Sequence, residues 1–235
     1  MNSISALSTP IGFDRSDLLS VLSLSLGTTV ARQNRLGEFI GKNNWSVQVS
    51  KREIKFGWHK YRIGLIGTES EYSGTWLWGW GHTEDGLPEG FSEPSENVRR
   101  LLPECSAFNE AKSELDGPLT GHNLSTVTVG TSDRNVCYYR CPYEGGAMFV
   151  EIEGLPEKLF RPLTLVEIAH LHADIISSYD CIHKLLAAGM LHQNGYAFTD
   201  NGSSITSASG GQELRFGFEE ADGIVRTSEI SLNRL

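Results

Sequence analysis

Three tryptophans and a histidine stand at alternate positions in GTWLWGWGH, residues 74–82. Successive side chains of a strand point to opposite faces, so Trp76, Trp78 and Trp80 would share one face. Each indole buries roughly 150–250 Å², and three exposed together would reach the ~300–600 Å² of a typical monomer's largest apolar patch. We therefore favour a core face covered by a helix of the same chain. A ligand shelf that ends at His82, or a protein interface, stays as an alternative.

A second group of side chains resembles part of a metal site. Glu167, His170 and Asp174 are spaced i, i+3 and i+7, which places them on one face of a helix. Glu-x-x-His is the unit of carboxylate-bridged metal bundles, but those need two copies and two further glutamates. One copy is present. We expect a solvated polar face with no metal and no cofactor, and these three residues remain the candidates for a divalent-metal site.

The motifs of covalent and phosphate chemistry are missing from the sequence. There is no Gly-x-Ser-x-Gly elbow and no His-Glu-x-x-His, and IGLIGTES lacks the Lys-Ser/Thr ending of a phosphate loop. We therefore assign no catalytic residue, and the sequence favours a protein that is not an enzyme.

The composition restricts partners and location. A net charge of −9 over 235 residues, with scattered lysines and arginines, argues against charge-driven binding of nucleic acid or of an anionic membrane. No apolar run approaches the roughly 18 residues that span a bilayer. The apolar stretch 18–31 follows Asp14 and Asp17 instead of a basic segment, unlike a secretion signal. We expect a cytoplasmic protein with reduced cysteines.

Hydrophobic spacing in the first half changes from helical to alternating. A helix is expected to begin after Asp14 and Asp17, whose carboxylates suit a helix N-terminus, and to end at GKNN, residues 41–44. WSVQVS, residues 45–50, alternates, and three further strand-like segments follow up to residue 81 with short polar or glycine-containing breaks, which predicts a meander of three or four antiparallel strands. The polar loop 83–96 then leads into a short helix within SENVRRLL.

The second half predicts another strand group and a long helix. Thr164 and Glu167 have capping-box spacing, and the apolar face that follows continues to a stop at Gly189. The polar, Gly-rich end of the chain holds two strand-like runs. The three strands expected before the helix are 124–131, 135–143 and 146–154.

Together these elements predict an α+β fold with antiparallel sheets and helices packed on one face, in the order αβββ(β)–α–βββ–α–ββ. We expect residues 1–13 to form a flexible N-terminal arm and residues 14–189 to form the α+β domain. Residues 190–235 are expected to form a strand-containing extension packed on the same domain.

The order of elements and the tryptophan strand resemble an uncharacterised bacterial family of unknown function, over residues 15–185. That family carries a Gly-Thr…Thr-Trp-x-Trp-x-Trp-like strand signature. The resemblance implies a bacterial α+β protein and supplies no activity. The matching positions are Gly67, Thr68, Thr75, Trp76, Trp78 and Trp80.

Three functional hypotheses follow. The leading one is a non-enzymatic cytoplasmic binding or interaction protein, whose partner is an unidentified protein or small molecule. The second is a small-molecule binder or hydrolase that uses the tryptophan shelf and His82. The third is a divalent-metal protein that uses Glu167, His170 and Asp174. A homo-oligomer is compatible with all three.

Overall fold

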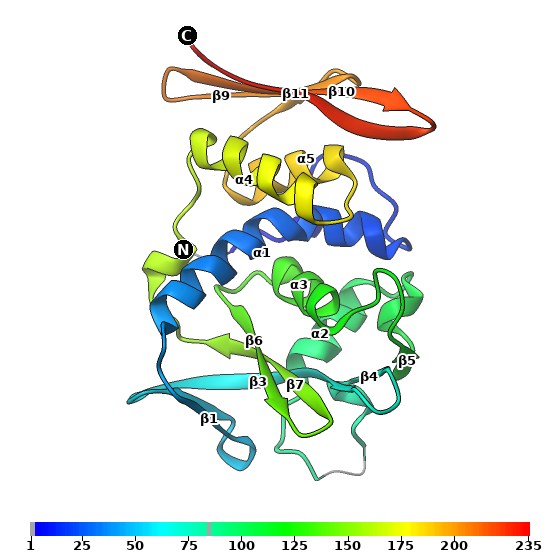
Figure 1. Ribbon diagram of the computed structural model, residues 1–235, viewed down its shortest axis with the longest axis vertical. Coiled ribbons are helices and arrows are strands. Elements are labelled where there is room, and N and C mark those ends of the chain that lie inside the picture. The colour runs from blue at the N-terminus through cyan, green and yellow to red at the C-terminus, as the bar shows by residue number, and fades with distance from the viewer. Residues whose placement is uncertain (1–2, 84–85) are drawn as a thin grey trace.

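The structure is a stack of layers around one central helix. The computed structural model describes residues 3–83 and 86–235. From one end to the other, the layers are a mixed-length antiparallel sheet, the helices α2 and α3, the long helix α1, the helices α4 and α5, and a second antiparallel sheet (Figure 1). The α+β class is confirmed.

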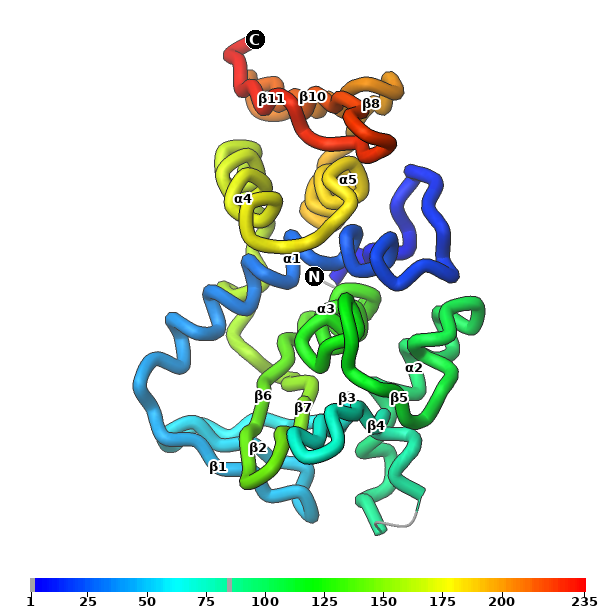
Figure 2. Tube along the Cα trace, turned by 45° about the vertical axis from the view of Figure 1, so that its right-hand side comes forward, coloured from blue at the N-terminus to red at the C-terminus, as the bar shows by residue number. Residues whose placement is uncertain are grey.

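Helix α1, Leu18–Ile40, forms the middle of the stack and is buried on nearly every side over residues 18–32. Asp17 caps it, accepting hydrogen bonds from the backbone N–H groups of Leu19 and Ser20, and Gly41 follows its last turn. Figure 2 shows α1 passing between α3, Gly121–Thr131, and α5, His183–Gln193. The predicted first helix is thus confirmed.

Small residues let α5 approach α1 closely. A Cβ atom at Gly189 would collide with the backbone carbonyl oxygen of Leu24, and one at Gly27 would collide with the side chain of Met190. No rotamer change can remove a clash with backbone, so Gly189 sets the distance between the two helices.

We therefore expect Gly189→Ala to lower the free energy of unfolding by about 1–3 kcal/mol, the usual cost of overpacking a tight core. The matched control is Gly37→Ala, also in a helix, where an added Cβ meets no atom within 4 Å. That control should gain roughly 0.5–1 kcal/mol from helix propensity. Denaturant melts of both variants measure the difference, and equal effects would contradict a close α1–α5 contact.

The first sheet is built around the long strand β3. Its hairpins to β2 and β4 occupy one edge, β7 pairs along the other edge, and β6 pairs with β7. Helices α2 and α3 contact this sheet through β3, and α3 also contacts β6 and β7. The elements are β1 Trp45–Gln48, β2 Glu53–Phe56, β3 His59–Ser70, β4 Thr75–Trp78, α2 Glu93–Leu101, β5 Lys112–Glu114, β6 Cys137–Tyr143 and β7 Gly146–Glu153.

The strand predicted for residues 124–131 is wrong, because this segment is the body of α3. Thr120 caps the helix by accepting a hydrogen bond from the N–H of Asn123. Residues 124–131 are all buried, so their β-branched side chains carry no polar face that would reveal a helical period. Short apolar runs of this kind fit a buried strand and a buried helix equally well.

The long helix expected from Thr164 to Gly189 is two helices, α4 Leu165–Ser178 and α5. The predicted capping box is confirmed: the Thr164 hydroxyl accepts from the Glu167 N–H, and the Glu167 carboxylate accepts from the Thr164 N–H. The chain turns extended at Tyr179, which ends α4.

The C-terminal residues form a four-stranded meander where two strands were predicted. Its order is β11-β10-β9-β8, and β10 and β11 pack against α4, with β11 also against α5. The burial of Leu214, Phe216 and Phe218 joins this sheet to the main core. The strands are β8 Thr199–Asp200, β9 Ser204–Ser209, β10 Gln212–Ala221 and β11 Ile224–Arg234.

Candidate functional site

Trp76 and Trp78 are core residues with no exposed surface. Their rings meet edge to face at 5.3 Å between centroids, and Trp76 also packs edge to face on Phe149. The Trp78 indole N–H donates to the carbonyl oxygen of Ala107 over 2.9 Å. Both rings therefore belong to the hydrophobic core, and neither has surface that a ligand could contact.

Trp80 leaves the row because β4 ends at Trp78 and residues Gly79–Gly81 form a short 3-10 turn. Its ring is half-buried beneath the guanidinium of Arg99, which lies 3.9 Å from the ring centroid. His82 comes next, with its Nε2 atom 3.2 Å from the hydroxyl oxygen of Thr68. The predicted alternation therefore stops at Trp78.

The carboxylate of Glu167 is already occupied by protein groups. It accepts hydrogen bonds from both terminal nitrogens of Arg161, at 3.0 and 2.5 Å, and these bonds with the cap lower the Glu167 pKa to about 2. His170 and Asp174 are exposed on the same helix. In the part of the chain that the structure describes, no group of three or more His, Cys, Asp or Glu residues is arranged to hold a metal ion.

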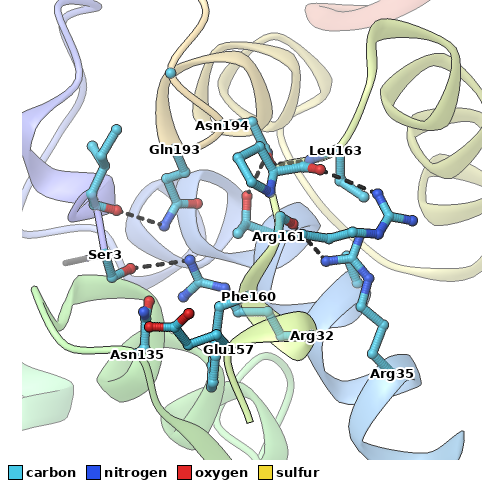
Figure 3. Close-up of a pocket in the computed structure, with 15 residues that line it drawn as sticks. Ser3, Arg32, Arg35, Asn135, Glu157, Phe160, Arg161, Leu163, Gln193 and Asn194 are labelled. Atoms are coloured by element: carbon cyan, nitrogen blue, oxygen red, sulfur yellow. Dashed lines mark hydrogen bonds between the residues drawn. The ribbon is translucent and has the colours of Figure 1, made fainter. Parts of the chain in front are cut away.

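A cavity of about 260 Å³ lies beside the middle of α1, and three arginines line it (Figure 3). Helix α1 supplies Arg32 and Arg35, and the segment before α4 supplies Arg161. The other lining residues come from the N-terminal segment, from the loop before β6, from α1, from residues 157–163 and from the end of α5: Ser3, Ile4, Thr28, Ala31, Asn135, Glu157, Phe160, Pro162, Leu163, Gln193, Asn194 and Gly195. We call this space the arginine cavity.

Two of the three arginines are held by protein acceptors. Arg161 pairs with Glu167, and the Nη1 atom of Arg35 donates to the carbonyl oxygens of Leu159 and Arg161, at 3.2 and 2.7 Å. These bonds attach residues 157–163 to α1, and they leave the positive charge of Arg35 without a carboxylate within 4.0 Å among the described residues.

Arg32 is the exception, since it is buried and has almost no partner. The residue is 6% exposed, and among residues 3–83 and 86–235 its side chain makes a single hydrogen bond, from Nη2 to the Ser3 hydroxyl over 3.1 Å. The guanidinium carbon lies 5.6 Å from the centroid of the Phe160 ring. No carboxylate lies within 4.0 Å of it in residues 3–83 and 86–235, and burial lowers the Arg32 pKa.

Sequence reasoning missed this cavity. Its two halves lie far apart in the chain, on α1 and on the segment before α4. One usable signal was present: Arg32 and Arg35 stand i and i+3 on a helix, which places them on one face.

A second cavity, of about 410 Å³, contains a buried carboxylate that does have a partner. Glu151 of β7 is 1% exposed, and its Oε1 atom accepts from the Nη2 atom of Arg134 over 2.7 Å. Arg134 also pairs with Glu153 at 2.8 Å. Burial raises the Glu151 pKa to about 7, although the Arg134 charge opposes the shift.

This raised pKa predicts a pH-dependent stability. The unfolded chain releases the Glu151 proton near its ordinary pKa of 4.5, whereas the folded chain keeps the proton until about pH 7. The contribution of this group to stability is therefore largest below about pH 4.5 and is lost as pH rises to about 7. Relative to Glu151→Gln, the wild-type free energy of unfolding should fall by on the order of 2–3 kcal/mol across that window.

Urea melts of both proteins at several pH values measure this difference. Glu153→Gln is the matched control, because it changes the half-buried glutamate on the same arginine. If the wild type and Glu151→Gln keep a constant difference in stability between pH 4.5 and 7.5, Glu151 does not titrate in this range.

Of the described helices, none is both long and apolar enough to span a bilayer. No curated protein and no solved structure matches the chain. The model of a family of unknown function, DUF6882, matches residues 20–154, which include most of α1 and the whole first sheet. Five of the residues that line the arginine cavity lie within the match, and the others lie outside it: those within are Thr28, Ala31, Arg32, Arg35 and Asn135. With more than half of its length matched, the chain belongs to the family of unknown function DUF6882.

Proposed function

We propose that this protein binds a small anionic ligand in the arginine cavity. The observation that carries the proposal is Arg32, a 6%-exposed residue whose guanidinium has one hydroxyl partner and no carboxylate partner in the part of the chain that the structure describes. Burying an unpaired charge is costly, so buried charges are normally paired. The chain has 29 acidic residues, yet none of those described pairs with this arginine. A bound anion would supply the missing partner.

The surroundings of Arg32 support the same proposal. Arg35 lines the cavity as well and adds positive potential to a chain whose net charge is −9, whereas the charge of Arg161 is paired with Glu167. A guanidinium presents several N–H donors in a planar fork that matches carboxylate and phosphate oxygens. The volume of about 260 Å³ is just below the ~300–1,000 Å³ of ligand pockets, so the ligand is a small molecule.

This proposal narrows the hypothesis of a non-enzymatic binding protein. The polar groups of the cavity are arginines, amides and hydroxyls, with Glu157 as the carboxylate among the lining residues. These groups suit recognition of an anion. We also propose a cytoplasmic location, on the support that the four cysteines are free thiols.

The experiment is a set of thermal melts of the full chain in sodium acetate, benzoate, phosphate and sulfate, with chloride used to equalise ionic strength. At least one anion should raise the melting temperature of the wild type, because a ligand that binds only the folded state stabilises by RT ln(1 + [L]/Kd). Arg32→Met should lose that response.

Arg215→Gln is the matched control, since it removes an exposed arginine that pairs with Glu229 on the second sheet. Its response to each anion should equal that of the wild type. The proposal fails if none of the four anions stabilises the wild type, or if Arg32→Met responds as strongly as the wild type does.

A further inference from the structure

We infer that the ligand of the arginine cavity is an organic monocarboxylate, with its carboxylate on Arg32 and a compact apolar body against Phe160, Leu163 and Ile4. This inference rests on the proposed function and adds the chemical class of the ligand.

The unused donors of the cavity match a single negative charge. Both terminal nitrogens of Arg161 and the Nη1 atom of Arg35 already donate to protein oxygens. Arg32 therefore offers the guanidinium with the most unused donors, and one such group matches one carboxylate. A phosphate dianion would bring a second charge and a third oxygen that need further donors.

The neighbouring helices α1 and α5 line the cavity with a helix middle and a helix C-terminus. Phosphate sites commonly use the N–H groups at a helix N-terminus. Here α1 contributes its middle, Thr28 to Arg35, and α5 contributes its C-terminal end, Gln193 to Gly195. A helix C-terminus carries a partial negative charge, which disfavours a multiply charged anion. The first turn of α4 is nearby, but Glu167 already caps it.

Apolar side chains form a wall around Arg32. Phe160 lies beside the guanidinium, as Figure 3 shows, and Ala31, Pro162 and Leu163 line the same space. Ile4, at the edge of the cavity, keeps 37% of its surface exposed. A ligand with an apolar body would cover these side chains, whereas an inorganic anion would leave them against water.

The volume of the cavity limits the size of the ligand. At about 30 Å³ per water-sized group, a cavity of about 260 Å³ holds roughly nine non-hydrogen atoms. Benzoate is of this size, and nucleotides are much larger. Benzoate is therefore the probe, and benzamide, which has the same shape without the charge, is its neutral counterpart.

The experiment is isothermal titration of the full chain with benzoate, benzamide, acetate and phosphate. Benzoate should bind at least tenfold more tightly than acetate, which lacks the apolar body, and at least tenfold more tightly than phosphate. Benzamide should bind at least tenfold more weakly than benzoate, because it cannot neutralise Arg32.

Two variants assign the contributions. Arg32→Met should abolish binding of benzoate. Phe160→Ala should lower the affinity for benzoate roughly tenfold and change the affinity for acetate less than twofold. Arg215→Gln should bind all four probes as the wild type does. Should Phe160→Ala fail to fold, the ratio of benzoate to acetate affinity in the wild type tests the apolar wall by itself.

The outcomes separate this inference from the proposed function. If phosphate binds more tightly than benzoate and Arg32→Met abolishes it, the monocarboxylate inference is overturned and the anion site stands. If benzoate binds no more tightly than acetate, the inferred contact with an apolar body is wrong. If benzoate binds no more tightly than benzamide, the inferred role of the ligand's charge is wrong. If no anion binds, the inference and the proposed function fail together.

Discussion

Replacing Trp78 with alanine should lower the free energy of unfolding by about 3–5 kcal/mol, the range for deleting a large core aromatic. The side chain has no exposed surface, packs on Trp76 and Phe108, and holds the carbonyl oxygen of Ala107 through its indole N–H. Losing it leaves a cavity and an unpaired carbonyl between the sheet and residues 106–108. Urea denaturation followed by circular dichroism measures the change.

The matched control is Trp58→Ala, because Trp58 is 84% exposed at the turn between β2 and β3. A surface substitution of this kind should change stability by less than about 0.5 kcal/mol. A loss below about 1 kcal/mol for Trp78→Ala would contradict its place in the core and reopen a binding role for the tryptophan strand.

Replacing Arg32 with methionine should raise the free energy of unfolding by about 1–4 kcal/mol when no ligand is present. Well-packed apolar groups that replace buried charges are often stabilising by this amount, and methionine keeps most of the arginine's length and its contact with Phe160. The reason is that the unpaired guanidinium costs desolvation energy that the Ser3 hydroxyl only partly offsets. A denaturant melt in chloride buffer measures the gain.

Arg134→Met is the control with the opposite expected sign. It removes the guanidinium that donates to the buried Glu151 and should lower stability by about 1–3 kcal/mol, the cost of leaving a buried polar group without its partner. Equal losses for Arg32→Met and Arg134→Met would mean that Arg32 is a structural residue with its charge already satisfied.

The sequence predicted the elements whose signals are local. Asp17 and the Thr164–Glu167 pair indicate where α1 and α4 begin, and the alternation of apolar residues indicates the strand that contains Trp76. The prediction from the sequence failed for α3, because burial leaves this helix without a polar face. It also failed at Gly79–Gly81, where a short 3-10 turn ends the strand. Such failures reflect tertiary contacts, which local patterns do not contain.

The arginine cavity could not be predicted from the sequence for a different reason. An arginine on an amphipathic helix normally keeps its charged end in water. Arg32 is buried because α5, the N-terminal segment and residues 157–163 close over it, and none of these neighbours is near it in the chain. Its importance lies in the absence of a carboxylate partner among the described residues, which is a property of the folded chain alone.

The most direct test of anion binding at Arg32 is a crystal structure of the full chain grown with benzoate. We predict density for the ligand in the arginine cavity, with carboxylate oxygens about 2.7–2.9 Å from the Arg32 nitrogens. An empty cavity in which Arg32 forms an ion pair with a carboxylate of the chain, such as that of Glu157, would contradict the proposal.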